Sequence, residues 1–107
     1  MSAKETAAVG LLFELLESRY ALRVLWALKD GHPQTFRILQ DSVGKITPNT
    51  LNTRVKELRA AGLMTHGTSG YTLTTLGSDL LKRLGDLQAF AGKWSTSLNK
   101  AGVIKKK

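Results

Sequence analysis

Between residues 47 and 61, polar side chains capable of hydrogen bonding recur at helical spacing. At about 100° per residue, Asn49, Thr53 and Lys56 point about 140° to 200° away from Leu51, and Asn52 lies about 100° to one side. Asparagine pairs bidentately with adenine, threonine contacts a base edge or a thymine methyl group, and lysine reaches guanine or phosphate. These residue types in this pattern favour contact with base edges in the major groove of DNA.

Exposed Asn, Thr and Lys are also ordinary on a solvent-facing helix, so this face gains meaning only from its surroundings. The helix is preceded by a short capped helix and a tight turn, and is followed by a hairpin. Arg54 and Arg59 lie on its flanks, where phosphate contact is expected. The candidate DNA-binding residues of this recognition helix are Thr47, Asn49, Thr50, Asn52, Thr53, Arg54 and Lys56. Candidate backbone contacts are Thr35, Arg37 and Arg59, and candidate wing contacts are His66, Thr68 and Ser69.

The remaining chemistry-bearing residues do not assemble into a catalytic or metal-binding pattern. His32 and His66 are the only histidines, there is no cysteine, and no cluster of acids stands at ligand spacing. Ser18, Ser42 and Ser69 are typical of caps and turns. No glycine-rich phosphate loop follows a strand. We therefore expect neither an enzyme nor a resident cofactor or metal.

The charge of the chain points to a polyanionic partner. Its 107 residues carry a formal net charge of +8 and suit a single domain. Residues 93–107 hold five lysines and no acid. This basic tail either solvates the terminus or contacts phosphates. Without a basic leader or an apolar run of about 18 residues, we expect a cytoplasmic, nucleoid-associated protein with no membrane partner.

Capping and breaking signals divide the chain into helices at about 6–17, 19–29, 36–42 and 47–61. Helical spacing predicts that the second of these helices faces inward with Leu22, Leu25, Trp26 and Leu28, and the fourth with Leu51, Val55 and Leu58. Thr47-Pro48 is a strong helix start, Asp30-Gly31 with Pro33 a strong stop, and Gly44 a sharp turn. Strands are expected at about 63–66 and 71–73, joined by a four-residue loop over 67–70. A last helix from Thr74 or Thr75 to residue 98 would be about 34 Å long.

The last predicted helix carries a coiled-coil spacing of apolar residues. Its seam is Leu80, Leu84, Leu87, Ala91, Trp94 and Leu98, spaced four, three, four, three and four. The seam packs either on the chain's own core or on a second copy. A homodimer is favoured because such a helix outreaches a core of about 70 residues. The first helix, apolar over more than half its circumference, adds Leu12, Phe13 and Leu16 to the expected interface.

Taken together, these segments resemble a winged helix-turn-helix regulator of the HxlR type over about residues 10–98. Four segments carry the resemblance. They are Tyr20 to Gly31, Thr35-Phe36 with Leu39, Ile46-Thr47 with Leu51, Arg54, Leu58, Gly62 and Leu63, and lastly Tyr71, Leu73, Thr74 and Gly77. Three departures stand out. The cysteine with which many relatives sense oxidants or electrophiles is absent, Thr35 stands where arginine is common, and the wing tip lacks Arg and Lys.

The resemblance implies a mainly α fold with a small β-hairpin and N- and C-terminal dimerisation helices. One domain would span 1–98, with the helix-turn-helix at about 35–61, the wing at about 63–73 and the dimer helix at about 75–98, followed by a tail at 99–107. It implies a homodimer whose recognition helices enter successive major grooves of an inverted-repeat operator.

The leading hypothesis is therefore a homodimeric, sequence-specific regulator of transcription, of a prokaryotic type, that binds double-stranded DNA. A winged-helix module that binds proteins, or a sequence-neutral architectural DNA-binding protein, is the alternative. Neither the operator nor a small-molecule effector can be identified from the sequence.

Overall fold

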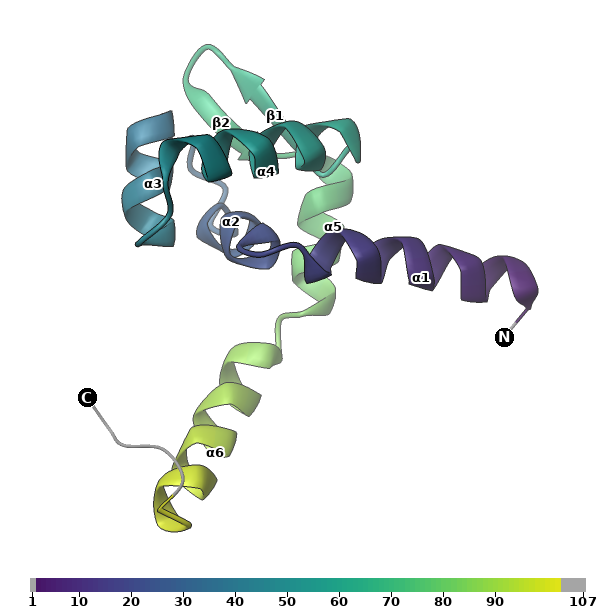
Figure 1. The fold of residues 1–107 in the computed structure, drawn as a ribbon, viewed down its shortest axis with the longest axis vertical. Helices are drawn as coiled ribbons and strands as arrows, with labels where there is room; N and C mark the ends of the chain where they lie inside the picture. The colour runs from purple at the N-terminus through teal and green to yellow at the C-terminus, as the bar shows by residue number, and fades with distance from the viewer. Residues whose placement is uncertain (1, 103–107) are drawn as a thin grey trace.

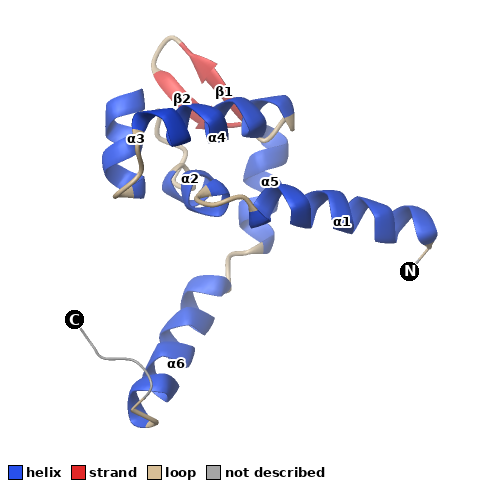
Figure 2. Ribbon diagram, in the orientation of Figure 1, coloured by secondary structure: helices blue, strands red, loops and turns tan. Residues whose placement is uncertain are grey.

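The structure is a computed structural model that describes residues 2–102 and is mainly helical, with one small hairpin (Figures 1 and 2). In chain order the elements are α1 (Ala3–Glu17), α2 (Ala21–Ala27), α3 (Phe36–Val43), α4 (Pro48–Ala60), β1 (Met64–Gly67), β2 (Gly70–Leu73), α5 (Thr75–Arg83) and α6 (Leu87–Lys100). This confirms the predicted fold class. Helix α3, the turn that follows it and helix α4 form the helix-turn-helix.

The core lies where α2 packs against α3, α4 and α5, with the hairpin closing one side (Figure 1). Its largest fully buried side chains are Val24, Leu25, Leu28, Leu39, Leu51, Val55, Leu58 and Met64. The three from α4 are those predicted from helical periodicity. Leu22 and Trp26 of α2 were expected to face inward with Leu25 but are only half-buried, because they line a surface cavity instead.

The hairpin is tighter than predicted. Strands β1 and β2 pair antiparallel from Met64↔Leu73 to Gly67↔Gly70, so the turn contains only Thr68 and Ser69. The predicted four-residue loop is wrong because both glycines belong to the strands. Gly70 has φ +129°, and a Cβ atom there would lie 2.6 Å from the carbonyl oxygen of Gln34, which pairs with Tyr71 beside β2.

Helix α1 begins three residues earlier than predicted and extends away from the core (Figure 1). The reason is a capping box: the Ser2 hydroxyl accepts from the Glu5 N–H at 3.2 Å, and the Glu5 carboxylate accepts from the Ser2 N–H at 3.1 Å. These bonds hold the pKa of Glu5 below its usual value. None of the fifteen residues of α1 is buried.

The predicted single helix over 75–98 is wrong: the chain turns at Leu84–Asp86 and divides it into α5 and α6 (Figure 1). The Leu84 N–H bonds to the carbonyls of Leu80 and Leu81, and the Gly85 N–H bonds to that of Lys82 at 3.0 Å. Glycine favours such a turn over a continued helix. The predicted seam is therefore divided too, with Leu80 on α5, Leu84 in the turn and the other four members on α6.

Candidate nucleic-acid interface

The outer face of α4 presents the side chains predicted to read bases. Asn49, Asn52, Thr53 and Lys56 are all exposed. Leu51, Val55 and Leu58 on the opposite face are buried, at no more than 2% exposure. This burial fixes the rotation of α4 about its axis, so the polar face points outward by default.

Several hydroxyl groups of α4 are already engaged within the helix. Thr47 caps α4 by accepting the Thr50 N–H at 3.2 Å, and it donates to the Thr50 hydroxyl at 2.9 Å. The Thr53 hydroxyl donates to the Asn49 carbonyl at 3.0 Å. The group that Thr53 leaves unengaged is its methyl. The free amide donors and acceptors on this face are those of Asn49 and Asn52.

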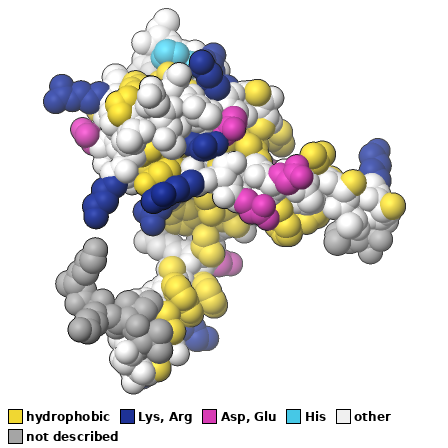
Figure 3. Space-filling view, viewed as in Figure 1, with side chains coloured by type: hydrophobic (Ala, Val, Ile, Leu, Met, Phe, Trp, Pro, Cys, Tyr) yellow, Lys and Arg dark blue, Asp and Glu magenta, His cyan; other side chains and the backbone are white. Residues whose placement is uncertain are grey.

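The positively charged side chains of α4 differ in whether they form an ion pair within the protein. Arg54 forms an ion pair with Glu57 on the same helix, and its side chain is only 18% exposed. Lys56 and Arg59 are exposed and have no carboxylate partner among residues 2–102. Residues 36–60 carry five basic and two acidic side chains. In Figure 3, dark-blue Lys and Arg side chains surround the part of the surface formed by α3 and α4.

The turn between α3 and α4 is held by contacts that the sequence pattern did not reveal. The Gln40 side-chain amide donates to the Ile46 carbonyl at 3.0 Å, which closes the turn. Gln34 donates to the Ala27 carbonyl at 2.6 Å and accepts from the Ser42 hydroxyl at 3.0 Å, so it ties α2 to α3. Glutamines at these positions carry no periodic signal, since their partners are groups brought near by the fold.

The predicted backbone contacts Thr35 and Arg37 lie at the start of α3, and both are exposed. The Thr35 hydroxyl caps α3 by accepting the Ile38 N–H at 3.2 Å. Thr35 therefore has a structural role, and its contact with DNA stays a prediction. Arg37 is unpaired among the described residues.

The wing offers little positive charge. His66 stacks on Tyr71 across the hairpin, with ring centroids 4.0 Å apart and an interplanar angle of 11°. Thr68 and Ser69 form the exposed turn. All three predicted wing residues are thus on the surface, but the His66 ring is held against its neighbour.

Close backbone contact holds the base of the wing to α5. A Cβ atom at Gly77 would lie 1.9 Å from the Leu63 carbonyl oxygen, so only glycine fits there. Thr74 caps α5 by accepting the Gly77 N–H at 3.0 Å and donates to the Gly62 carbonyl at 2.6 Å. The Thr-x-x-Gly part of the sequence signature therefore fixes how the wing and α5 meet the end of α4.

Apolar side chains remain exposed on α1 and α6, which flank the helix-turn-helix (Figure 3). Phe13 is 56% exposed, Phe90 59% and Trp94 53%. Phe13 and Trp94 belong to the predicted dimer residues, and Phe90 does not. Of the remaining predicted dimer residues, Leu12, Leu16, Leu80, Leu84 and Leu98 are half-buried, and Leu87 and Ala91 are exposed.

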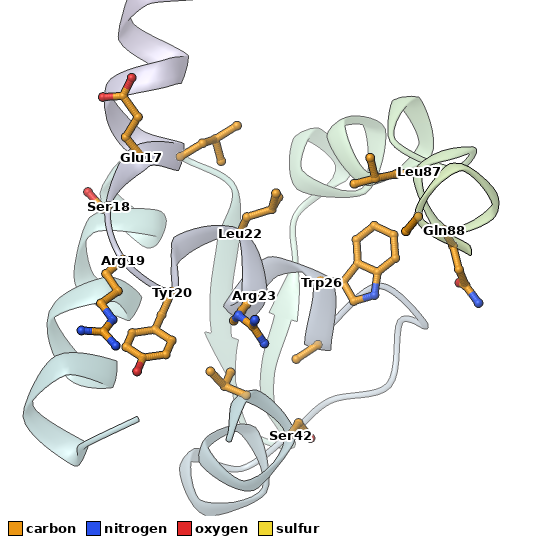
Figure 4. A pocket seen from close by; sticks show the side chains of 14 residues that line it. Glu17, Ser18, Arg19, Tyr20, Leu22, Arg23, Trp26, Ser42, Leu87 and Gln88 are labelled. Carbon is orange, nitrogen blue, oxygen red and sulfur yellow. The ribbon is translucent and has the colours of Figure 1, made fainter. Parts of the chain in front are cut away.

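Two cavities collect members of this set. A cavity of about 720 Å³ between the end of α1, α2 and α6 is lined by Leu16, Leu87 and Ala91 together with Trp26 (Figure 4). A second, of about 410 Å³, lies between α1 and α5 and includes Leu12 and Leu80. Five of the nine predicted dimer residues thus fall into two groups rather than one continuous seam, and Phe13, Leu84, Trp94 and Leu98 line neither cavity.

Residues 2–102 offer neither a metal site nor a membrane span. They contain no group of three or more His, Asp or Glu side chains placed to hold a metal ion. None of the helices described is long and apolar enough to span a bilayer.

The helix-turn-helix, the following hairpin and the flanking helices define a winged helix-turn-helix protein. Residues 15–99 match the family model of the HxlR-like helix-turn-helix, so the chain belongs to that family of DNA-binding transcription regulators. No protein with a curated description matches the chain.

Two solved structures of a Bacillus subtilis regulator are similar to the chain. The quinone-bound form of YodB shares 28% identity over 81% of this chain and 98% of its own, with a TM-score of 0.72. The reduced form of the transcriptional regulator YodB shares 28% identity over 85% of this chain and 91% of its own, with a TM-score of 0.67.

Proposed function

We propose that this regulator acts as a homodimer and reads an inverted-repeat operator in double-stranded DNA through α4. The observation that carries the proposal is the orientation of α4. Its apolar face is fully buried, so Asn49, Asn52, Thr53 and Lys56 point outward together. Asn49 and Asn52 would pair with adenines, and the Thr53 methyl would contact a thymine. Such a protein would reside at the nucleoid.

Dimerisation through α1 and α6 accounts for their exposed apolar residues. Helix α6 buries none of its residues, yet Leu87, Ala91, Trp94 and Leu98 lie within a sector of about 60° around its axis. A helix with an apolar stripe requires a partner surface. In a two-fold dimer, the stripes of two copies cover one another, and the two α4 helices reach half-sites about one turn of DNA apart.

Backbone affinity would come mainly from cations outside the wing. Arg37 lies on α3, and Lys56 and Arg59 lie on α4. All three are unpaired among the described residues. The predicted contribution of the tail falls largely on Lys105, Lys106 and Lys107, which lie outside the described residues. Because the wing tip has no cation, a minor-groove contact there would add little.

Selection from a random pool of duplex DNA at near-physiological salt tests the proposal. We expect enrichment of an inverted repeat with half-sites about one helical turn apart. Retention of DNA without an enriched motif would contradict base reading and indicate an architectural protein. No retention, even at low salt, would contradict DNA binding by this chain and favour a protein partner.

A further inference from the structure

A cluster of cations surrounds a cavity beside the helix-turn-helix that the proposed base and backbone contacts do not explain. The cavity has a volume of about 540 Å³ and is lined by Arg19, Tyr20, Arg23, Val43, Gly44 and Lys45. Three of these six residues are positively charged, none is acidic, and they come from two separate parts of the chain. A cleft lined by charges of one sign concentrates counter-ions of the other sign.

The three cations are unpaired among residues 2–102. The two ion pairs found there are Arg54–Glu57 and Arg83–Asp79. Glu17 lines the adjoining larger cavity but forms no ion pair with either arginine. Three cations held at one concave site without a carboxylate leave it electrostatically complementary to an anion.

The backbone around the cluster is held in an uncommon conformation. Tyr20 (φ +73°) and Lys45 (φ +52°) are the two residues other than glycine with positive φ in the part of the chain described. The Tyr20 hydroxyl donates to the Lys45 carbonyl at 3.3 Å, so the two strained residues are tied together. Left-handed residues other than glycine occur preferentially at functional sites. Here they fix the positions of the segments that carry the cations.

Arg19 and Arg23 both line this cavity, just before and within α2. The Arg19 guanidinium carbon lies 5.0 Å from the centre of the Tyr20 ring, which orients it. Figure 4 shows Arg19, Tyr20 and Arg23 together around the beginning of α2. Guanidinium groups suit phosphate because their planar donors match its oxygens.

We propose that Arg19, Arg23 and Lys45 bind phosphates of the DNA backbone beside the recognition helix. Lys45 stands three residues before Pro48, the first residue of α4, so the cluster adjoins the end of α4 that enters the groove first. In helix-turn-helix complexes the N-terminal part of the recognition helix contacts bases while preceding elements cross the backbone. This inference rests on the proposed function and assigns the strand contact that the wing does not make.

The test compares two variants that lose the same charge. The first carries Arg19→Gln, Arg23→Gln and Lys45→Asn, the last chosen because asparagine tolerates positive φ. The control carries Lys4→Gln, Lys29→Gln and Lys82→Gln, at exposed positions on α1, just after α2 and on α5. Binding of a non-specific duplex, and of the selected operator, is measured between about 50 and 200 mM salt.

Each phosphate contact contributes about 0.9 to the slope of log K against log salt. We expect the slope of the first variant to become less negative by about 0.9 per lost contact, and so by nearly three per protomer, on both DNAs. The control should keep the wild-type slope. Asn52→Ala should show the opposite pattern, with weaker operator binding and an unchanged slope. Single variants, each expected to lose about 0.9, replace the triple variant if circular dichroism shows that it is unfolded.

Equal slopes for the first variant and the control would overturn this inference while leaving the proposed function intact. Absence of any DNA binding by the wild type would overturn both. A third measurement separates DNA from a free anion. The Tm of the wild type and of the first variant is measured in phosphate and in chloride at equal ionic strength. If phosphate raises the Tm of the wild type alone, and the salt slopes of the first variant and the control are equal, the site binds a free anion instead of DNA.

Discussion

At the residue scale, the face of α4 separates groups that are available to DNA from groups that the protein itself uses. Thr53 is the clearest case because its hydroxyl is bonded to the Asn49 carbonyl at 3.0 Å. The Arg54 guanidinium is likewise already engaged, because it forms an ion pair with Glu57. Residue type alone therefore overstates how many groups of a recognition helix can reach bases.

The role of the Thr53 methyl can be tested by separating it from the hydroxyl. Thr53→Ser removes the methyl, and we expect operator binding to weaken by about 1 kcal/mol, roughly fivefold in Kd. Thr53→Val keeps the methyl and should bind within about twofold of wild type. Fluorescence anisotropy on the selected operator measures both. Thr96→Ser is the matched control, because Thr96 is also exposed and donates to the carbonyl of residue i−4, Gly92, at 3.0 Å. The reverse order, with Val weaker than Ser, would assign the contact to the hydroxyl.

At the element scale, the junction of the wing and α5 depends on one close backbone approach. The N-terminal turn of α5 passes so near Leu63 that Gly77 has no room for a side chain. Thr74 bonds to both sides of this junction, to the Gly77 N–H and to the Gly62 carbonyl. The end of α4, the wing and α5 are therefore locked together at Leu63.

Substitution of Gly77 should consequently damage the whole fold. We expect Gly77→Ala to destabilise the protein by about 3 kcal/mol or more, because the new methyl would displace the Leu63 carbonyl. In a chain of this size that lowers Tm by more than about 10 °C, measured by circular dichroism.

Gly92→Ala is the control: a methyl group there would meet no other atom within 4 Å, and it would face away from the apolar stripe of α6. That variant should be neutral or more stable by up to about 1 kcal/mol. Similar Tm values for the two variants would refute the close-approach account.

At the scale of the whole molecule, the compact helix-turn-helix core carries two protruding helices that it cannot cover. The principal extents are 46, 41 and 23 Å, and α1 and α6 account for the long directions (Figure 1). Their exposed aromatic residues, Phe13, Phe90 and Trp94, lie outside the core. If the protein binds DNA as a two-fold symmetric dimer, a second copy of the chain would cover these residues.

The dimer is tested by removing aromatic area from α6. Phe90→Ser with Trp94→Ser removes two half-exposed aromatic side chains from each copy, so we expect the dimer Kd to rise at least about a hundredfold. Sedimentation velocity should then show a monomer at micromolar concentration where the wild type is a dimer. Ile38→Ser, which removes a side chain 52% exposed on α3, is the control and should leave the dimer unchanged. A wild type that sediments as a monomer would refute the proposed dimer directly.

Local patterns in the sequence were sufficient to predict the helices of the helix-turn-helix. Thr47-Pro48 marked the start of α4, and the spacing of Leu51, Val55 and Leu58 identified its buried face, because caps and amphipathic periodicity act within a few residues. The outward-facing polar residues of α4 followed from the same periodicity. Their contacts with DNA remain predictions.

Only the tertiary structure decided how these elements are joined. The break at Leu84–Asp86 was missed because a heptad spacing continues through it, and an apolar pattern does not report the direction of a helix axis. The Gln34 and Gln40 bonds, the approach of Gly77 to Leu63 and the meeting of Arg19, Arg23 and Lys45 join groups that lie apart in the chain. The sequence by itself determined the fold class, the order of the elements and the outward face of α4, since local forces set them. The cation cluster and the paths of α1 and α6 depend on packing between distant segments, which no local pattern records.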